Sequence, residues 1–286
     1  MIKYLHTNNR EVDLSEMENT KEVFDFYNNG AEIGRLESGL GMVEFYRTKE
    51  ILSQYISQPS TIYDIGGGIG KYAEWLAENG HHVTMTELAP TAVDYAIKNM
   101  KTPYTAEVGD ARKLNKPDES ADVVLLMGPL YHLQNKDDRQ KVFREAYRVL
   151  KKGGLLIAAG ISRFSTTTWA LSKYGSENNF LDDDIYMNML RQEFETGEHH
   201  RPKEYPFFIA DAYFHTPAEM KSEFCHNGFE VINDHAVEGS VWIVPTLDAK
   251  WKDSDSRKRL LDIIHATEHE ESMMGMSPHF LVIGRK

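Results

Sequence analysis

The residues best suited to bind a ligand form one short glycine-rich segment. Residues 64–70 read Asp-Ile-Gly-Gly-Gly-Ile-Gly. Glycine permits sharp turns and lets backbone N–H groups approach a ligand closely. An apolar run, Thr61 to Ile65, precedes the turn, and a helical pattern follows it. This order predicts a strand, a turn and a helix that bind a nucleotide-like ligand at the carboxyl end of the strand.

Two common nucleotide-binding motifs fit this turn poorly. A phosphate-binding loop needs four residues between its first glycine and its Gly-Lys pair, followed by Ser or Thr. Here Gly66 and Gly70 enclose three residues, and Tyr72 follows Lys71, so that motif is excluded. A dinucleotide fingerprint needs Gly or Ala where Lys71 stands, which weakens that alternative.

A third ligand, S-adenosylmethionine, fits better because it carries no pyrophosphate. It requires an acidic residue just before the turn and glycines at alternate positions, and Asp64, Gly66, Gly68 and Gly70 meet both requirements. On this motif the chain resembles the class I S-adenosylmethionine-dependent methyltransferases over roughly residues 45–160. The resemblance implies S-adenosyl-L-methionine as cofactor and S-adenosyl-L-homocysteine as product.

The resemblance also implies roles for residues after the next strands. Glu87 ends the second predicted strand, where the family places an acid on the ribose hydroxyls, and a carboxylate suits a vicinal diol. Asp110 follows the third strand, where the family places an acid on the adenine amine. The expected cofactor-binding residues are Asp64, Gly66, Gly67, Gly68, Gly70, Glu87, Leu88, Asp110, Ala111, Met127 and Gly128.

Two residues after the fourth strand are candidates for catalysis. The cofactor supplies an electrophilic methyl group, and the protein must align a nucleophile with it and exclude water. A hydroxyl or protonated amine acceptor also needs a base. His132 is the first candidate because imidazole titrates near neutral pH, and Tyr131 is the second. The alternative is that His132 caps the next helix or packs beside Tyr131.

The N-terminal segment mixes charges, glycines and an aromatic residue without a clean apolar stripe. Tyr27 to Glu37 therefore has the composition of a lid that closes over cofactor and substrate. Arg35 or Arg47 could bind the cofactor carboxylate, since arginine binds carboxylates in a fork. The alternative for either arginine is a surface ion pair with Glu37 or Glu44.

An alternation of strands and helices carries these residues. It predicts one α/β domain: a doubly wound, Rossmann-like, seven-stranded and mostly parallel sheet with an antiparallel last strand, a helical N-terminal lid and an inserted cap. The predicted strands are 61–65, 82–86, 104–108, 121–127, 155–160, 229–234 and 280–284. Apolar residues at helical spacing predict two helices between Lys21 and Tyr55, with breaks near 28–30 and 39–41. The other predicted helices are 71–79, 91–100, 137–150, 185–195, 216–227 and 256–270. A basic-Gly-Gly turn at 151–154 separates the fourth strand's helix from the fifth strand.

The chain divides into four expected parts of a single domain, 1–286. These are the lid at 1–57, the cofactor-binding half at 58–160, the cap at 161–216 and the C-terminal half of the sheet at 217–286. The cap is rich in aromatic residues. We expect most of them to form its core and a minority to line an apolar substrate pocket.

The amino-acid composition limits the classes of partner that the protein is expected to bind. The chain has 32 Lys and Arg and 44 Asp and Glu, a net charge of −12, which argues against nucleic acid and anionic membranes. A single cysteine, Cys225, and short apolar runs favour a cytoplasmic protein without a membrane helix. No metal is expected, because His199, His200 and His215 lack a metal-binding spacing.

These observations predict methyl transfer to an oxygen or nitrogen of a small organic molecule by a monomer or homodimer. Gly128-Pro-Leu-Tyr131 differs from the Asn-Pro-Pro-Tyr or Asp-Pro-Pro-Tyr of enzymes that methylate nucleobase amines. The alternatives are an RNA or protein methyltransferase on the same fold, a NAD-dependent oxidoreductase that uses Glu87, and a non-catalytic cofactor-binding module.

Overall fold

The computed structural model describes residues 32–286, which form a seven-stranded sheet of order β3-β2-β1-β4-β5-β9-β8. The strands are β1 (Thr61–Ile65), β2 (His82–Glu87), β3 (Thr105–Val108), β4 (Ala121–Leu126), β5 (Leu150–Ile161), β8 (Glu230–Ala236) and β9 (His279–Arg285). Strands β1 to β5 are parallel, and β9 runs antiparallel to both β5 and β8. The predicted fold class is confirmed.

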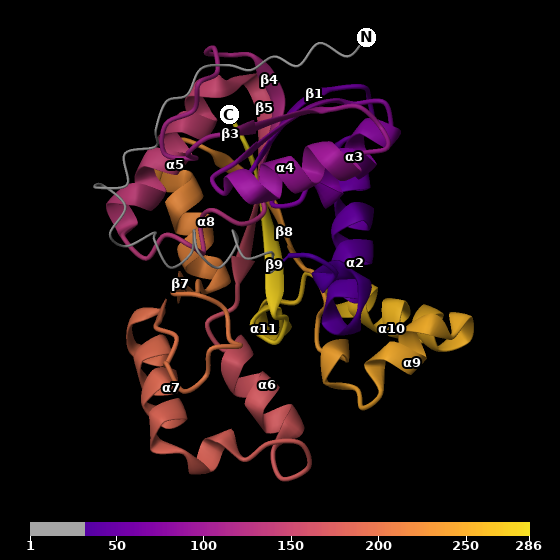
Figure 1. Ribbon diagram of the computed structural model, residues 1–286, viewed down its shortest axis with the longest axis vertical. Coiled ribbons are helices and arrows are strands. Elements are labelled where there is room, and N and C mark those ends of the chain that lie inside the picture. The colour runs from indigo at the N-terminus through magenta and orange to yellow at the C-terminus, as the bar shows by residue number, and fades with distance from the viewer. Residues whose placement is uncertain (1–31) are drawn as a thin grey trace.

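Helices cover both faces of this sheet (Figure 1). On one face α2 (Gly39–Tyr55), α3 (Lys71–Glu78) and α4 (Pro90–Asn99) contribute to one apolar core. On the other face α5 (Lys136–Val149) and α8 (Pro217–His226) contribute to a second core. Strand β4 is buried along almost its whole length between the two, as its apolar run from Val123 to Leu126 predicts.

Local sequence explains where the helices begin. The Asn135 side chain accepts a hydrogen bond from the Asp137 amide at the start of α5. Helix α8 starts with a capping box between Thr216 and Glu219, and Pro217 occupies its first turn. These caps satisfy backbone N–H groups that the helix itself leaves unpaired.

The structure corrects the predicted start of the fifth strand. The sequence predicts a turn at 151–154 and a strand from residue 155. The structure instead begins β5 at Leu150, which pairs with Ala121, and the register then shifts before Val123 pairs with Leu155. The left-handed conformation of Gly153, with φ 80°, accommodates this irregularity inside the strand.

Two long connections extend beyond the carboxyl ends of the parallel strands, and Figure 1 shows them on opposite sides below the sheet. After β5 come α6 (Ser165–Lys173), the 3₁₀ helix η3 (Phe180–Asp182), α7 (Asp184–Thr196) and the two-stranded sheet of β6 (Glu198–His199) and β7 (Ala212–Tyr213). Between β8 and β9 come η4 (Val241–Ile243), α9 (Leu247–Lys252), α10 (Ser254–Thr267) and α11 (Glu271–Met274). Of these, the sequence predicted only α7 and α10.

The aromatic residues after β5 mostly pack against one another. Tyr186 lies at the centre of a cluster with Phe180, Tyr205 and Phe208, with ring centroids 5.2 to 6.0 Å apart. This agrees with the expectation that most of them form a local core.

The predicted lid lies only partly within the described residues. Tyr27 and the first predicted helix fall outside them, and the described part begins with the 3₁₀ helix η2 (Arg35–Glu37) before α2. Among residues 32–286, no helix combines the length and apolar character that spanning a bilayer requires.

Candidate active site

The glycine turn after β1 requires glycine at several positions. Gly66, Gly68 and Gly70 have φ of 71°, 56° and 80°, a region that other residues rarely adopt. A Cβ atom on Gly66 would lie 2.6 Å from the Pro129 ring, and one on Gly67 would lie 2.5 Å from the Met85 side chain. The turn is therefore held tightly against β2 and the end of β4.

Asp64 lies under this turn as a buried acid. Neither carboxylate oxygen has a hydrogen-bond partner of ordinary geometry among the described residues. Burial, together with the charge of Glu87, raises the pKa of Asp64 to about 7, and the nearby Ala73 backbone opposes this only in part. A buried acceptor without a donor suits a ligand that brings N–H groups of its own.

Glu87 binds the glycine turn from the end of β2. Its carboxylate accepts hydrogen bonds from the Gly68 and Ala89 amides, both at 2.9 Å. Burial raises the pKa of Glu87, and these two backbone donors oppose the effect. Glu87 thus couples the end of β2 to the turn.

Asp110 lies two residues beyond the end of β3, at the same sheet edge. Its carboxylate is bound by the Arg112 guanidinium, with Nη2 to Oδ2 at 2.6 Å, and Arg112 also contacts Asp138. The structure therefore brings Asp64, Glu87 and Asp110 to the carboxyl ends of adjacent strands β1, β2 and β3, as predicted from their order.

A pocket of about 660 Å³, including space open to solvent, lies beside the turn. It joins the turn at Gly66–Ile69 to Met127 and Gly128 at the end of β4 and to Ala159 in β5. Its remaining walls are Glu32, Arg35, Leu36, Glu44, Thr48, Lys71, Tyr72, Tyr131, Val237, His279 and Leu281. Of the predicted cofactor residues, Asp64, Gly70, Glu87, Leu88, Asp110 and Ala111 do not line it.

The two predicted catalytic residues differ in position. Tyr131 lines the pocket and donates a hydrogen bond from its hydroxyl to the Met127 carbonyl at 2.8 Å. His132 does not line the pocket: its ring packs edge-on against Tyr131, with centroids 4.7 Å apart, and it interacts with the Asp211 backbone. Burial, with a further contribution from the Arg35 charge, lowers the pKa of His132 to about 3.

Arg35, predicted to bind the cofactor carboxylate, pairs instead with carboxylates of the protein. Its guanidinium forms a fork on Glu44, with N–O distances of 2.5 and 3.0 Å, and its Nε lies 2.9 Å from both Glu32 oxygens. Burial alone would raise the pKa of Glu44, but Arg35 and His279 hold it below its ordinary value. The pocket wall therefore carries positive and negative side chains that are paired with one another.

His279 and Glu238 complete this group, which we call the cavity cluster: Arg35, Glu44, Glu238 and His279. The His279 Nδ1 atom lies 2.6 Å from Glu238 and 3.9 Å from Glu44. Burial alone would lower the pKa of His279, but the two carboxylates raise it to about 9. The imidazole therefore carries a positive charge at neutral pH.

Arg47, the other predicted cofactor arginine, belongs to a second group away from the pocket. We call it the enclosed cluster: Arg47, Glu50, Tyr55, His235 and Glu268. Arg47 is fully buried and binds the Glu50 and Glu268 carboxylates. His235 binds Glu268 through Nδ1 at 3.0 Å and Tyr55 through its other ring nitrogen at 2.7 Å.

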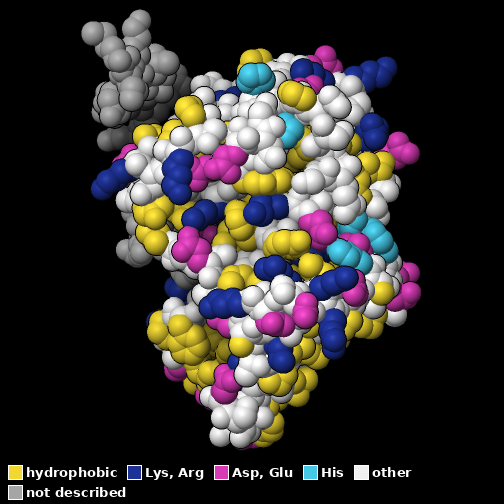
Figure 2. Space-filling view, turned by 90° about the vertical axis from the view of Figure 1, so that its right-hand side faces the viewer, with side chains coloured by type: hydrophobic (Ala, Val, Ile, Leu, Met, Phe, Trp, Pro, Cys, Tyr) yellow, Lys and Arg dark blue, Asp and Glu magenta, His cyan; other side chains and the backbone are white. Residues whose placement is uncertain are grey.

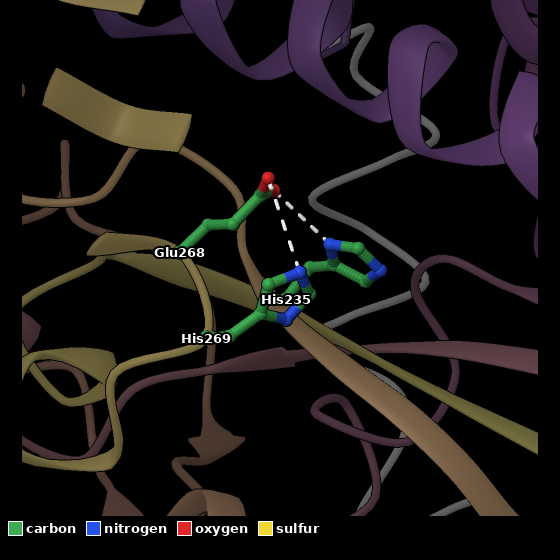
Figure 3. A group of neighbouring side chains, drawn as sticks. All are labelled: His235, Glu268 and His269. Atoms are coloured by element: carbon green, nitrogen blue, oxygen red, sulfur yellow. Dashed lines mark hydrogen bonds and ion pairs between the residues drawn. The ribbon is translucent and has the colours of Figure 1, made fainter. Parts of the chain in front are cut away.

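Figure 3 shows His235 and the adjacent His269 turned toward the Glu268 carboxylate. These three residues are close enough to share an ion, as are Glu44, Glu238 and His279. The Glu268 carboxylate, however, is already neutralised by Arg47, and the Glu238 carboxylate by His279. Neither group leaves a carboxylate unpaired for a cation.

The surface drawn in Figure 2 shows Lys and Arg side chains interspersed with Asp and Glu. A nucleic-acid interface usually needs a continuous basic stripe. This face lacks one among the residues drawn in colour.

Sequence reasoning missed Glu238 and His279 and treated Glu44 only as an ion-pair partner. One topological signal was available. A strand predicted to run antiparallel starts at the edge where the parallel strands end. The residues that flank the connection between the last two strands therefore lie at the ligand-binding edge.

Comparisons with known proteins agree with this geometry. Residues 63–158 match the family model described as a methyltransferase domain. The chain is 29% identical to phosphoethanolamine N-methyltransferase 3 of Arabidopsis thaliana over 125 residues, which are 42% of this chain and 25% of that protein. Matches to this and two other curated relatives span 25%, 39% and 30% of their lengths.

Solved structures share the fold over most of the chain. A possible histamine N-methyltransferase from Thermotoga maritima has a TM-score of 0.55 at 19% identity, covering 93% of this chain and 99% of that one. The 1,6-didemethyltoxoflavin-N1-methyltransferase of Burkholderia thailandensis, solved with S-adenosylhomocysteine, has a TM-score of 0.55 at 14% identity, covering 98% and 92%. Together with the glycine turn, the acids that follow it and the strand order already described, the family match identifies residues 63–158 as a methyltransferase domain of the class I S-adenosylmethionine-dependent type.

Proposed function

We propose that the protein transfers a methyl group from S-adenosylmethionine to an oxygen or nitrogen of a small organic molecule. The observation that carries this is the pocket, which joins the glycine turn to the end of β4 and is walled by Arg35 and Leu36 from the N-terminal side. The same pocket is lined by Met127, Gly128 and Tyr131, which lie at or just beyond the end of β4.

The residues present suit this cofactor. Asp64 offers buried oxygens to which no described residue donates a hydrogen bond of ordinary geometry, and the glycine turn leaves space that a side chain would fill. When bound, the sulfonium supplies a methyl group that is already electrophilic. The chain's own part is to hold the cofactor at the turn, keep water from the pocket and position the acceptor beside Met127 and Tyr131.

Within this proposal Tyr131 lines the pocket beyond the end of β4, and the His132 ring packs edge-on against the Tyr131 ring. The Tyr131 hydroxyl donates to a main-chain carbonyl, so it is fixed in orientation. His132 has a pKa too low for an efficient base at neutral pH. His132→Asn should therefore alter S-adenosylhomocysteine affinity by less than ~1 kcal/mol.

The names of the relatives support a small acceptor. One acts on phosphoethanolamine and another on 1,6-didemethyltoxoflavin, both small molecules. The oxidoreductase alternative is disfavoured because Lys71 occupies the place of the third small residue of a dinucleotide turn.

Calorimetry with S-adenosylmethionine, S-adenosylhomocysteine and NAD⁺ tests the cofactor. We expect the first two to bind and NAD⁺ not to bind. Micromolar NAD⁺ binding without binding of either sulfur compound would overturn the proposal. Release of S-adenosylhomocysteine is then measured with phenols, alkylamines and nitrogen heterocycles, and turnover with total RNA or an unmodified protein extract alone would favour the polymer alternatives.

A further inference from the structure

The connection between β8 and β9 returns to the sheet edge that carries the pocket. Glu238 follows the end of β8, and His279 is the first residue of β9. Because β9 runs antiparallel to β5, its first residue lies beside Ile161, the last residue of β5. The fold thus places a histidine and a carboxylate at the sheet edge that carries the pocket.

Glu238 is built to hold this histidine. Its side chain is fully buried, and Oε2 accepts hydrogen bonds from the Ser277 hydroxyl and the His279 amide, both at 3.0 Å. Its other oxygen, Oε1, faces the His279 Nδ1 at 2.6 Å. A carboxylate fixed in this way orients the imidazole and stabilises its protonated form.

The second ring nitrogen of His279 remains available. Nε2 makes no hydrogen bond with any described residue. It is not fully buried either, so it retains accessible surface. His279 lines the pocket, and its side chain is 19% exposed. Because His279 is a pocket-lining residue and its Nδ1 is held by Glu238, we infer that Nε2 is the ring nitrogen available to a ligand in the pocket.

We propose that Glu238 and His279 form the proton-accepting dyad of the reaction, and that the acceptor is a small molecule whose reacting oxygen or nitrogen carries a proton. The inference rests on the proposed function. As the acceptor atom forms its bond to the methyl carbon, the carbon–sulfur bond breaks and its electron pair stays on sulfur. The proton of the acceptor moves to His279 Nε2, while Glu238 retains the hydrogen bond to Nδ1.

The charges around His279 make this dyad responsive to the cofactor. The groups that face it are Glu238, Glu44 and Arg35, from the end of β8, from α2 and from η2. In the free protein the carboxylates keep the imidazole protonated. A nearby sulfonium opposes that charge and should lower the pKa of His279 by about one unit or more, which raises the fraction of neutral imidazole whose Nε2 can accept a proton.

The two sulfur compounds separate this effect from binding itself, since S-adenosylhomocysteine lacks the sulfonium charge. The full chain, labelled with ¹³C at the histidine rings, is titrated by NMR alone, with S-adenosylhomocysteine and with S-adenosylmethionine. His279→Gln assigns the resonance. We expect a pKa near 9 without ligand, little change with S-adenosylhomocysteine, and a value lower by about one unit or more with S-adenosylmethionine.

Two variants sharpen the test. Glu238→Gln should lower the pKa of His279 in every state, whereas His226→Gln, at the exposed end of α8, should change none. With any phenol or amine that turns over, His279→Gln should slow the reaction by roughly 100-fold or more, and Glu238→Gln should move the pH–rate profile to lower pH.

The outcomes distinguish the two proposals. If neither sulfur compound binds, the proposed function fails. If both bind and the pKa of His279 is the same with each, the dyad is overturned while the function stands. If Glu238→Gln does not fold, the comparison of the two ligands on the unmodified chain still decides the matter.

Discussion

The cavity cluster and the enclosed cluster use the same residue types and share helix α2. Glu44 belongs to the first and Arg47, three residues later, to the second. Each cluster contains an arginine, two carboxylates and a histidine from the C-terminal part of the chain. In the enclosed cluster both nitrogens of His235 are bonded, whereas in the cavity cluster Nε2 of His279 is left open to the pocket. Buried charge alone therefore does not distinguish the two clusters; an unbonded ring nitrogen on a pocket-lining residue does.

The largest effect should come from the enclosed cluster, on stability. Glu268→Ala leaves the fully buried Arg47 guanidinium without one of its two carboxylate partners, and breaking a buried pair costs about 3–5 kcal/mol. Urea unfolding should show this loss, while the folded fraction binds S-adenosylhomocysteine with unchanged affinity. A large loss of affinity would show that the two clusters act as one.

The cavity cluster should control stability at alkaline pH. The folded pKa of His279, about 9, lies above the ordinary value of 6.5, so its contribution is complete below pH ~6.5 and is lost as the pH rises through 9. The unfolding free energy should fall by up to about 3 kcal/mol over this range. His279→Gln should flatten this slope. An unchanged slope in the variant would assign the effect to another group.

The third prediction concerns cofactor affinity and Glu87, a residue that belongs to neither cluster. Glu87→Ala removes one hydrogen bond from the glycine turn, one from the Ala89 amide and the expected acceptor for the ribose, and should weaken S-adenosylhomocysteine binding by about 2–3 kcal/mol. Calorimetry measures this. Glu107→Gln, which alters a half-exposed acid paired with Lys116, is the control. Equal affinities for Glu87→Ala and the control would make Glu87 a structural acid only.

The smallest effect compares two glutamates of the same helix. Glu44→Gln reduces the negative charge beside the pocket and should weaken binding of the cationic S-adenosylmethionine by about 1 kcal/mol more than that of S-adenosylhomocysteine. Glu50→Gln, in the enclosed cluster, should affect both ligands equally. If both variants discriminate between the ligands to the same extent, the distinction between the clusters fails.

The sequence was most informative where a local conformation requires a particular residue. The glycine turn could be predicted because Gly66, Gly68 and Gly70 adopt a backbone conformation that few other residues tolerate. The seven strands could be predicted because a sheet covered on both faces needs short apolar runs between helices. The start of β5 could not, because Lys151 and Gly153 are typical of a turn and the strand accommodates them as an irregularity.

The pocket wall required information that no local pattern contains. Glu238 and His279 are 41 residues apart, and both lie more than two hundred residues after Arg35. Their meeting depends on strand order and on the direction of β9. Arg47 shows the converse. Its sequence neighbourhood resembles that of a ligand-binding arginine, but its side chain is buried and pairs with Glu268 at the C-terminal end of α10.

The hydroxyl of Ser277 has a consequence for engineering. It accepts hydrogen bonds from the Glu238 and Gly239 amides at 3.0 Å and so ties together both ends of the excursion that contains α9, α10 and α11. The position of His279 therefore depends on the contacts of Ser277 with Glu238 and Gly239, where the excursion begins and ends, and not on the helices between them. Added residues at the exposed Pro245–Thr246 stretch cost mainly loop entropy, which grows only slowly with length. This stretch is thus a permissive site for grafting a fluorescent reporter that follows ligand binding without displacing the pocket.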